Sequence, residues 1–291
     1  MRALVLLRAI RVHHWAKNLL VFVPLVTAHR VLDAPSAIAA FLAFVAFSLA
    51  ASAVYLVNDI ADIEDDRRHA TKRHRAIAAG ELARGTALAV AFCFLIGAAL
   101  AAWPLPRQFA DFLGLYLVVN LAYSAGLKRV MLLDVFVLTG FYVLRILAGA
   151  AAIEVPVSHW LLAFSLFVFL SLALAKRYVE LGGSTARADG RAAGRGYAVG
   201  DAPMLGVFGA ASGYLSILVF ALYITSEQVV AVYRSPPMLW FAVPLLLYWL
   251  SRVWLLAHRG ELDEDPMLFA LRDPASYVVA AGIAAAMFAA T

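Results

Sequence analysis

Long apolar stretches separated by polar segments dominate the pattern of hydrophobic and polar positions along the chain. A helix needs about 17–25 apolar residues to cross a bilayer. Stretches of roughly this length recur nine times, near residues 18–33, 37–57, 84–104, 108–125, 130–152, 157–176, 204–225, 237–257 and 273–290. The pattern therefore predicts an all-α, polytopic membrane bundle with nine transmembrane helices, of which the first is short and contains Pro24.

The composition indicates that lipid is the solvent for much of the surface. The chain has 291 residues, of which 64% are hydrophobic and 15% are charged, and its mean hydropathy is +0.84. Soluble domains have roughly 45–50% apolar and about 25% charged residues, so the excess is too large for one buried core. We treat residues 1–291 as a single membrane domain. Its single cysteine, Cys93, excludes an internal disulfide framework.

Arginine and lysine are distributed unevenly among the polar segments. Twenty of the 24 basic residues fall in the N-terminal tail or in the segments 58–84, 126–129, 176–203 and 252–272. Arg30, Arg107 and Arg234 lie in the small linkers between these segments. The positive-inside rule makes the crowded side cytoplasmic, so we predict a cytoplasmic N-terminus. The net charge of +5 is then mostly a topological bias and not a signal for nucleic acid.

An acidic cluster follows the second apolar stretch, where residues 55–75 read YLVNDIADIEDDRRHATKRHR. Asn58, Asp62 and Asp66 are spaced i, i+4 and i+8, and Asp59 is three residues before Asp62. On a helix these four side chains lie along one face, about one turn apart.

Carboxylates stacked on one helix face repel each other, so a cation is needed to offset them. A hard divalent ion such as Mg²⁺ binds carboxylate and amide oxygens and bridges them to substrate phosphates. The alternative is a solvated helix end with salt bridges to neighbouring arginines, namely Arg67, Arg68 and Arg75.

The order N-D-x-x-D-x-x-x-D, at the end of the second of nine helices, resembles the first motif of the UbiA superfamily of intramembrane prenyltransferases. Asn58, Asp59, Asp62 and Asp66 match that motif position by position. The resemblance implies a UbiA-like fold in which these four residues hold Mg²⁺ and a diphosphate donor, with the three aspartates as the catalytic residues. We expect the cytoplasmic linkers 58–83 and 177–203 to form a cap over the site.

Typical members carry a second motif, D-x-x-x-D, after the sixth helix, and this chain departs from it. The matching segment reads LAKRYVEL, with Lys176, Arg177 and Glu180 in place of the paired aspartates. A site with fewer carboxylates and more cations suits a substrate with more phosphate charge.

A closer resemblance covers several segments: residues 48–82, RVHHWAKN at 11–18, AYSAGLK at 122–128, LRILAGA at 144–150, AKRYVEL at 175–181 and ALRD at 270–273. These resemble the decaprenyl-phosphate phosphoribosyltransferases of mycobacterial cell-wall synthesis. That branch transfers 5-phosphoribose from phosphoribosyl diphosphate to polyprenyl phosphate. The resemblance implies the same Mg²⁺-dependent reaction at the cytoplasmic face of a bacterial inner membrane, for a cell-envelope glycan precursor.

Both substrates of that reaction are anionic, and the chain offers cations and polar groups to bind them. The expected substrate-binding residues are Lys17, Asn58, Lys72, Arg75, Tyr123, Lys128, Arg145, Lys176, Arg177 and Glu180. The expected partners are the two substrates and membrane lipids, with no nucleic acid, and the oligomeric state is left open.

Arg145 lies well inside the fifth predicted span. A charge there costs at least about 2.5–3.5 kcal/mol on insertion scales, so Arg145 must be paired or solvated. It binds substrate or forms a structural pair with an acidic residue such as Asp134. Tyr123, at the end of the fourth span, could bond a ribose hydroxyl or a phosphate.

Three other functions compete with phosphoribosyl transfer. The first is transfer of an isoprenyl chain from its diphosphate to an aromatic or quinone-precursor acceptor, against which the missing second aspartate motif argues. The second is transport of a phosphorylated solute, which would favour repeated halves and broken helices; we see no internal repeat. The third is an inactive scaffold, which would not need the acidic face.

The predicted topology has a direct test. With nine spans and the N-terminus in the cytoplasm, a reporter enzyme fused after Thr291 should be active only if it functions outside the cytoplasm. A fusion that reports a cytoplasmic C-terminus would show that the number of spans is even.

Overall fold

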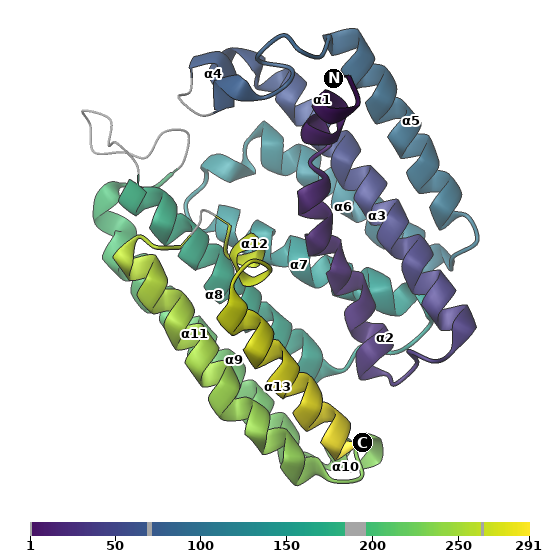
Figure 1. Ribbon diagram of the computed structural model, residues 1–291, viewed down its shortest axis with the longest axis vertical. Coiled ribbons are helices and arrows are strands. Elements are labelled where there is room, and N and C mark those ends of the chain that lie inside the picture. The colour runs from purple at the N-terminus through teal and green to yellow at the C-terminus, as the bar shows by residue number, and fades with distance from the viewer. Residues whose placement is uncertain (1, 69–71, 184–195, 263–264) are drawn as a thin grey trace. The chain divides into compact units, whose positions relative to one another are not determined.

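The computed structural model describes residues 2–68, 72–183, 196–262 and 265–291, and its regular elements in these ranges are helices (Figure 1). This confirms the predicted all-α class. The chain divides into two compact units, unit 1 with residues 1–125 and 144–157, and unit 2 with residues 126–143 and 158–291. The linkers expected to cap the site include 69–71 and 184–195, which lie outside the described residues.

The elements of unit 1 are α1 (Arg2–Ala9), the 3₁₀ helix η1 (Val12–Phe22), α2 (Val23–Thr27), α3 (Ala34–Ala61), α4 (Ile63–Arg68), η2 (Lys72–His74), α5 (Arg84–Ala102) and α6 (Arg107–Ala125). Helix α7 (Leu133–Ala152) belongs to unit 2 up to Val143 and to unit 1 from Leu144 onward. The other elements of unit 2 are η3 (Leu127–Arg129), α8 (His159–Gly183), η4 (Val199–Asp201), α9 (Ala202–Ile224), α10 (Glu227–Val232), η5 (Pro236–Phe241), α11 (Ala242–Arg259), α12 (Pro266–Ala270) and α13 (Pro274–Ala290).

Six helical segments in the described part of the chain are long and apolar enough to cross a membrane: Ala34–Ala61, Arg84–Ala102, Leu133–Ala152, His159–Gly182, Val199–Ile224 and Pro236–Arg259. Helix α13 is a shorter apolar helix. Each of the nine predicted spans overlaps a helical segment, but the count of nine spans stays a prediction. The chain is an integral membrane protein.

Helix α3 is the central element of unit 1. Asp33 caps its first turn by accepting hydrogen bonds from the backbone N–H of Ser36 at 3.2 Å and from its hydroxyl at 2.5 Å. Its buried residues are mainly alanines and serines, and α5 packs along it (Figure 1). Small side chains allow close contact between helices in lipid, where no hydrophobic driving force holds them together.

Unit 2 is organised around the packing of α8 against α9, with α11 on α9 and α13 on α11 and η5. The Ser171 hydroxyl donates to the carbonyl of Gly209 at 2.7 Å and accepts from the indole N–H of Trp254 at 3.0 Å. Arg252 donates to both oxygens of Asp273, at 2.7 and 2.9 Å. A bidentate pair of this kind fixes the orientation of the two side chains.

Within unit 1, α7 approaches the backbone of η1 closely at Gly149. A Cβ atom on Gly149 would lie 2.1 Å from the carbonyl oxygen of Val21, which is backbone and cannot move aside. On the same helix, a Cβ atom on Gly140 would meet nothing within 4 Å.

This contrast predicts opposite effects of two alanine substitutions in α7. Gly149→Ala should lower the free energy of unfolding by about 1–3 kcal/mol, as overpacking does. Gly140→Ala should leave it unchanged or raise it by up to about 1 kcal/mol, because alanine is the better helix former. Thermal unfolding of the purified variants in detergent measures both, and equal effects would contradict the close approach.

Candidate active site

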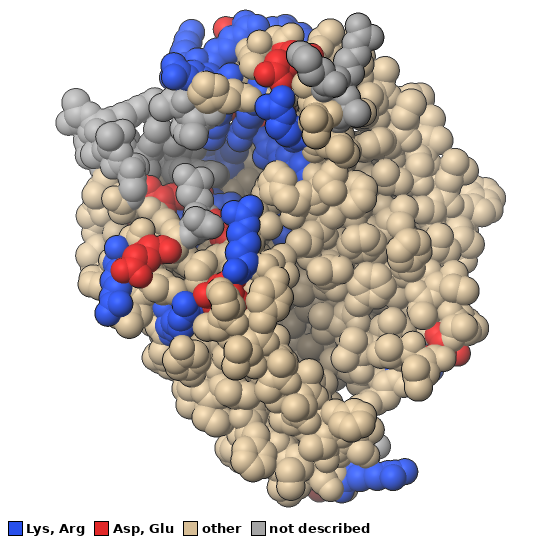
Figure 2. Space-filling view, in the orientation of Figure 1, with Lys and Arg blue, Asp and Glu red and all other residues tan. Residues whose placement is uncertain are grey.

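Charged side chains in unit 1 gather at one end. Figure 2 shows Lys and Arg side chains clustered at the end that carries α1 and α4, whereas the visible flank of α5 is almost uncharged. The acidic cluster lies at this end because α3 ends there. Charge gathered at one end of apolar helices is typical of a membrane interface.

The spacing predicted that the acidic cluster lies on one continuous helix, and this prediction is wrong. Helix α3 ends at Ala61, Asp62 is its C-cap with φ −93° and ψ 10°, and α4 begins at Ile63. Asn58 and Asp62 are half-buried, whereas Asp59 and Asp66 are buried, with 4% and 2% exposed. The break at Asp62 therefore divides the cluster between the end of α3 and the short helix α4.

Asp59 and Asp66 converge on one cationic group. The Nη1 atom of Arg75 donates to Asp59 Oδ1 at 3.2 Å and to Asp66 Oδ2 at 2.7 Å. The Nη2 atom of Arg11 also donates to Asp59 Oδ1, at 2.6 Å. The positive charge that the stacked carboxylates require is therefore supplied in this structure by two arginines.

The position of Arg75 bears on whether the residues fit Mg²⁺. No group of three or more Asp, Glu, His or Cys side chains converges tightly enough to hold a metal within the ranges that the structure describes. The carboxylates of Asp59 and Asp66 nonetheless both contact the guanidinium of Arg75. Mg²⁺ is commonly held by one or two carboxylates together with substrate phosphates and water, so this pair fits a metal that arrives with its substrate.

The other substrate-binding residues predicted for unit 1 lie on separate elements. Lys17 is half-buried on η1, and Lys72 is exposed on η2. Tyr123 is half-buried in the last turn of α6.

Arg145 is buried in unit 1, with 4% exposed, and is surrounded by polar and aromatic groups. Its Nε donates to Asn18 Oδ1 at 2.7 Å, and its Nη2 donates to the Tyr116 hydroxyl at 3.4 Å. The guanidinium carbon lies 5.0 Å from the centre of the Tyr116 ring and 5.9 Å from that of Phe47. Aromatic faces stabilise a desolvated cation.

The pairing of Arg145 with Asp134, considered from the sequence, does not occur. Both residues lie on α7, and eleven residues separate them along about 16 Å of helix axis. Asp134 instead receives Nε of Arg177 at 2.5 Å.

The 3₁₀ helix η1 repeats every three residues, so Trp15, Asn18 and Val21 lie on one face. The indole of Trp15 donates to Ser52 Oγ at 2.9 Å, and the amide of Asn18 donates to Ser48 Oγ at 3.0 Å. Both serines belong to α3 and are one turn apart. This face holds η1 against α3, and Lys17 is fixed on a neighbouring face.

In unit 2, α8 continues to Gly183, seven residues beyond the predicted end of that span. Lys176 and Glu180 are therefore one turn apart on a helix. Nζ of Lys176 lies 4.0 Å from Asp265 Oδ2, and Nη1 of Arg177 donates to Glu180 Oε2. Lys128 is half-buried in η3.

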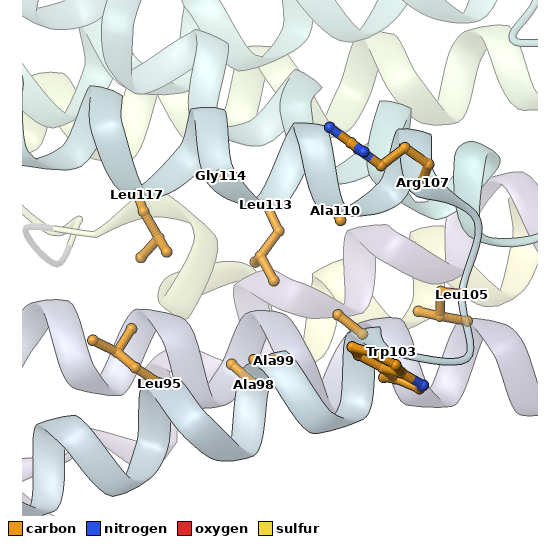
Figure 3. A pocket seen from close by; sticks show the side chains of 11 residues that line it. Leu95, Ala98, Ala99, Trp103, Leu105, Arg107, Ala110, Leu113, Gly114 and Leu117 are labelled. Atoms are coloured by element: carbon orange, nitrogen blue, oxygen red, sulfur yellow. The ribbon is translucent and has the colours of Figure 1, made fainter.

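A groove between α5 and α6 lies at the other end of these helices from the acidic cluster. It has a volume of about 570 Å³, and Arg107 is the charged residue among those that line it. In Figure 3 the side chains of Leu95, Leu113 and Leu117 point into it. This lining suits hydrocarbon chains and not a phosphorylated substrate.

Sequence reasoning missed several residues that shape these sites. Arg11 was counted only as a topological charge, although it lies in the RVHHWAKN segment that carries the resemblance. Asn18 is the last residue of the same segment and is fully buried. Its amide donates to Ser48 on α3 and accepts from Arg145 on α7. Nothing in the local pattern singles out Tyr197, whose hydroxyl donates to Asp134.

These features together define an integral membrane protein with paired acidic and basic groups at helix ends, suited to anionic substrates. Residues 19–288 match the UbiA prenyltransferase family. The chain therefore belongs to this family.

Three curated relatives are similar to the chain. The uncharacterised protein y4nM of Sinorhizobium fredii is 42% identical over 96% of this chain and 54% of that protein. The nodulation protein NoeC of Azorhizobium caulinodans is 34% identical over 95% of this chain and 90% of that protein. The decaprenyl-phosphate phosphoribosyltransferase of Mycolicibacterium smegmatis is 38% identical over 60% of this chain and 57% of that protein. The chain thus spans little more than half the length of the first and third.

A solved structure shares the fold. It is a UbiA homologue from Archaeoglobus fulgidus bound to GPP and Mg²⁺, with a TM-score of 0.73 and 14% identity. The match covers 98% of this chain and 99% of that one. The predicted UbiA-like fold is therefore confirmed.

The buried network around Arg145 predicts a specific loss of stability. Asn18→Ala removes the partner of a buried charge, and this should cost about 1.5–3 kcal/mol of unfolding free energy. Asn120→Ala is the matched control, because its half-buried amide donates, within the described residues, only to the Tyr116 carbonyl of the preceding turn, at 2.8 Å. Thermal unfolding in detergent compares the two, and an equal or smaller loss for Asn18→Ala would contradict the network.

Proposed function

We propose that this protein is a transferase that moves 5-phosphoribose from phosphoribosyl diphosphate to a polyprenyl phosphate in a Mg²⁺-dependent reaction. The observation that carries the proposal is the convergence of Asp59 and Asp66 on the single Nη1 atom of Arg75. Two buried carboxylates aimed at one cation form a place for a metal that accompanies a diphosphate.

The choice of a sugar-phosphate donor over a prenyl donor rests on unit 2. Lys176 and Glu180 lie one turn apart on α8, at the positions where the family's second motif would place two aspartates. A lysine in place of a carboxylate favours a donor with an additional phosphate. The likeness to the M. smegmatis phosphoribosyltransferase, which covers 60% of this chain, supports the same choice.

In this proposal Asp59 and Asp66 would hold Mg²⁺ together with the diphosphate, and Asn58 and Asp62 would complete its ligands once both are bound. The ion would neutralise charge on the diphosphate leaving group. Without substrate, Arg75 donates hydrogen bonds to the carboxylates of Asp59 and Asp66. Its guanidinium can exchange them for phosphate oxygens, since it binds both kinds of anion in the same forked geometry.

The remaining cations bind the phosphates of the two substrates. In unit 1 these are Lys17, Lys72 and Arg145, with Tyr123 available to bond a ribose hydroxyl. In unit 2 they are Lys128 and Lys176, with Glu180 close to Arg177. Lysine acts here as a point charge, which accommodates phosphates in different orientations.

The chemistry is a substitution at C1 of the ribose. The bond from C1 to the diphosphate oxygen breaks, and a bond from C1 to a phosphate oxygen of the lipid forms. A phosphate monoester is largely ionised at neutral pH, with a second pKa of about 6, so the attacking oxygen needs no general base. The products are diphosphate and a lipid phosphate linked to phosphoribose, a precursor for cell-envelope glycans.

The proposed setting is the bacterial inner membrane, with nine spans and the site at the cytoplasmic face. Residues 1–291 then act as one functional domain, and the linkers 58–83 and 177–203 cap the site. The apolar tail of the lipid enters sideways between helices, because it is insoluble in water.

One assay distinguishes the two donor classes. Purified protein with Mg²⁺ receives either labelled phosphoribosyl diphosphate with polyprenyl phosphate, or labelled prenyl diphosphate with an aromatic acid. We expect label in the lipid from the first mixture alone, and none when a chelator removes the metal. Label transferred from the second mixture alone would identify a prenyltransferase and overturn the proposal.

Substitution of the acidic cluster tests the residue assignment. Asp62→Ala should reduce transfer at least about 100-fold, because it removes a proposed metal ligand, while membrane insertion stays intact. Glu64→Ala is the control, since Glu64 is exposed and pairs with Arg67 at 3.3 Å. Full Mg²⁺-dependent activity in Asp62→Ala would show that the metal assignment is wrong.

A further inference from the structure

Unit 2 contains a buried polar cluster formed by Asp134, Arg177 and Tyr197, which are 0%, 1% and 1% exposed. Asp134 Oδ2 accepts from Arg177 Nε, and Asp134 Oδ1 accepts from the Tyr197 hydroxyl, both at 2.5 Å. Val135, Leu174 and other apolar side chains of α7, α8 and α9 pack around the cluster. Water is therefore kept away, and each of these polar contacts is strong because the surroundings are apolar.

Tyr197 connects this cluster to the turn that precedes α7. Its hydroxyl accepts the backbone N–H of Leu132 at 2.9 Å while it donates to Asp134. Burial, together with the hydrogen bond to Asp134, raises the pKa of Tyr197, so the hydroxyl stays protonated and keeps its donor. Leu132 has φ of 64°, a left-handed conformation that a leucine adopts only when its surroundings impose it.

Gly196 brings the chain close enough for this contact. A Cβ atom on Gly196 would lie 2.5 Å from the carbonyl oxygen of Arg129 and 2.8 Å from the backbone nitrogen of Met131. Residues 196 and 197 therefore dock directly on residues 129–132. Lys128 immediately precedes the docked turn.

Arg177 extends the cluster in the other direction along α8. Its Nε donates to Asp134, and its Nη1 donates to Glu180, which is on the same helix. Its side chain is 1% exposed and donates to two carboxylates, which compete with any phosphate for the guanidinium. Its forked geometry lets one side chain orient two carboxylates at once.

We propose that Asp134, Arg177 and Tyr197 form a positioning clamp that fixes Lys128 on one side and Glu180 on the other. The inference rests on the proposed function, in which Lys128 binds a substrate phosphate and Glu180 lies at a position of the family's second motif. It deepens that function by assigning Arg177 to positioning and not to direct contact with phosphate.

The first test is Tyr197→Phe, with Tyr178→Phe as the matched control. Tyr178 lies on α8, and its hydroxyl bonds His258 Nδ1 at the surface, at 3.0 Å. Tyr197→Phe should raise KM for phosphoribosyl diphosphate roughly tenfold, the lower end of what orienting partners contribute at metal sites, with little change in kcat. Tyr178→Phe should match the unmodified protein. A lower thermal stability with unchanged KM would indicate a structural role alone and overturn the clamp.

A second measurement does not depend on activity. The rate at which an amine-specific reagent labels Lys128, read by mass spectrometry, should rise several-fold in Tyr197→Phe, whereas labelling of Lys17 in unit 1 should not change. If the unmodified protein transfers no phosphoribose but this increase occurs, the proposed function fails and the clamp stands. An unchanged rate at Lys128 would overturn the clamp.

Double substitution distinguishes a positioning role of Arg177 from direct contact with substrate, and it also serves if Tyr197→Phe does not fold. Arg177→Lys keeps the charge but cannot reach both carboxylates, and Glu180→Gln removes the charge of the second. If Arg177 acts through Glu180, the double variant should have the same KM as the worse single variant. Multiplying effects would mean that Arg177 contacts the substrate itself, which overturns the assignment.

Discussion

A charged side chain removed from water has to be paired, because the cost of leaving it unpaired exceeds the stability of most single interactions. This constraint governs both units. Asp59 is buried and meets Arg11 and Arg75, while Arg145 meets an amide and two aromatic rings. In unit 2 the fully buried Arg177 meets Asp134. The packing of small residues lets helices approach, but these pairs decide which surfaces meet.

The partners in these pairs come from distant parts of the sequence. Arg11 and Asp59 are 48 residues apart, and Asn18 and Arg145 are 127 residues apart. Removing one member leaves the other buried and unsatisfied, which costs more than the pair itself contributes to stability. The segments that carry the pairs are therefore held in one arrangement, which a site with several anionic groups requires.

Local patterns predicted the helices well because hydropathy and length decide which segments can cross a membrane. The stretches expected at 84–104 and 108–125 became α5 and α6 with ends within two residues. The acidic motif was also located correctly at a helix end. Its geometry was not, because the break at Asp62 and the approach of Arg75 depend on contacts that no local spacing encodes. The docking of Tyr197 on the turn before α7 also depends on a contact between residues far apart in the sequence.

The 3₁₀ form of η1 alters the reach of the first apolar segment. A 3₁₀ helix rises about 2.0 Å per residue and an α-helix about 1.5 Å. The 11 residues of η1 and the five of α2 therefore extend about 30 Å together, against about 24 Å if all were α-helical. The hydrocarbon layer is about 30 Å thick. The stretch Val12–Thr27, which begins six residues before the span predicted at 18–33, thus has the length of the hydrocarbon layer. It reaches this length by stretching the helix and not by adding residues.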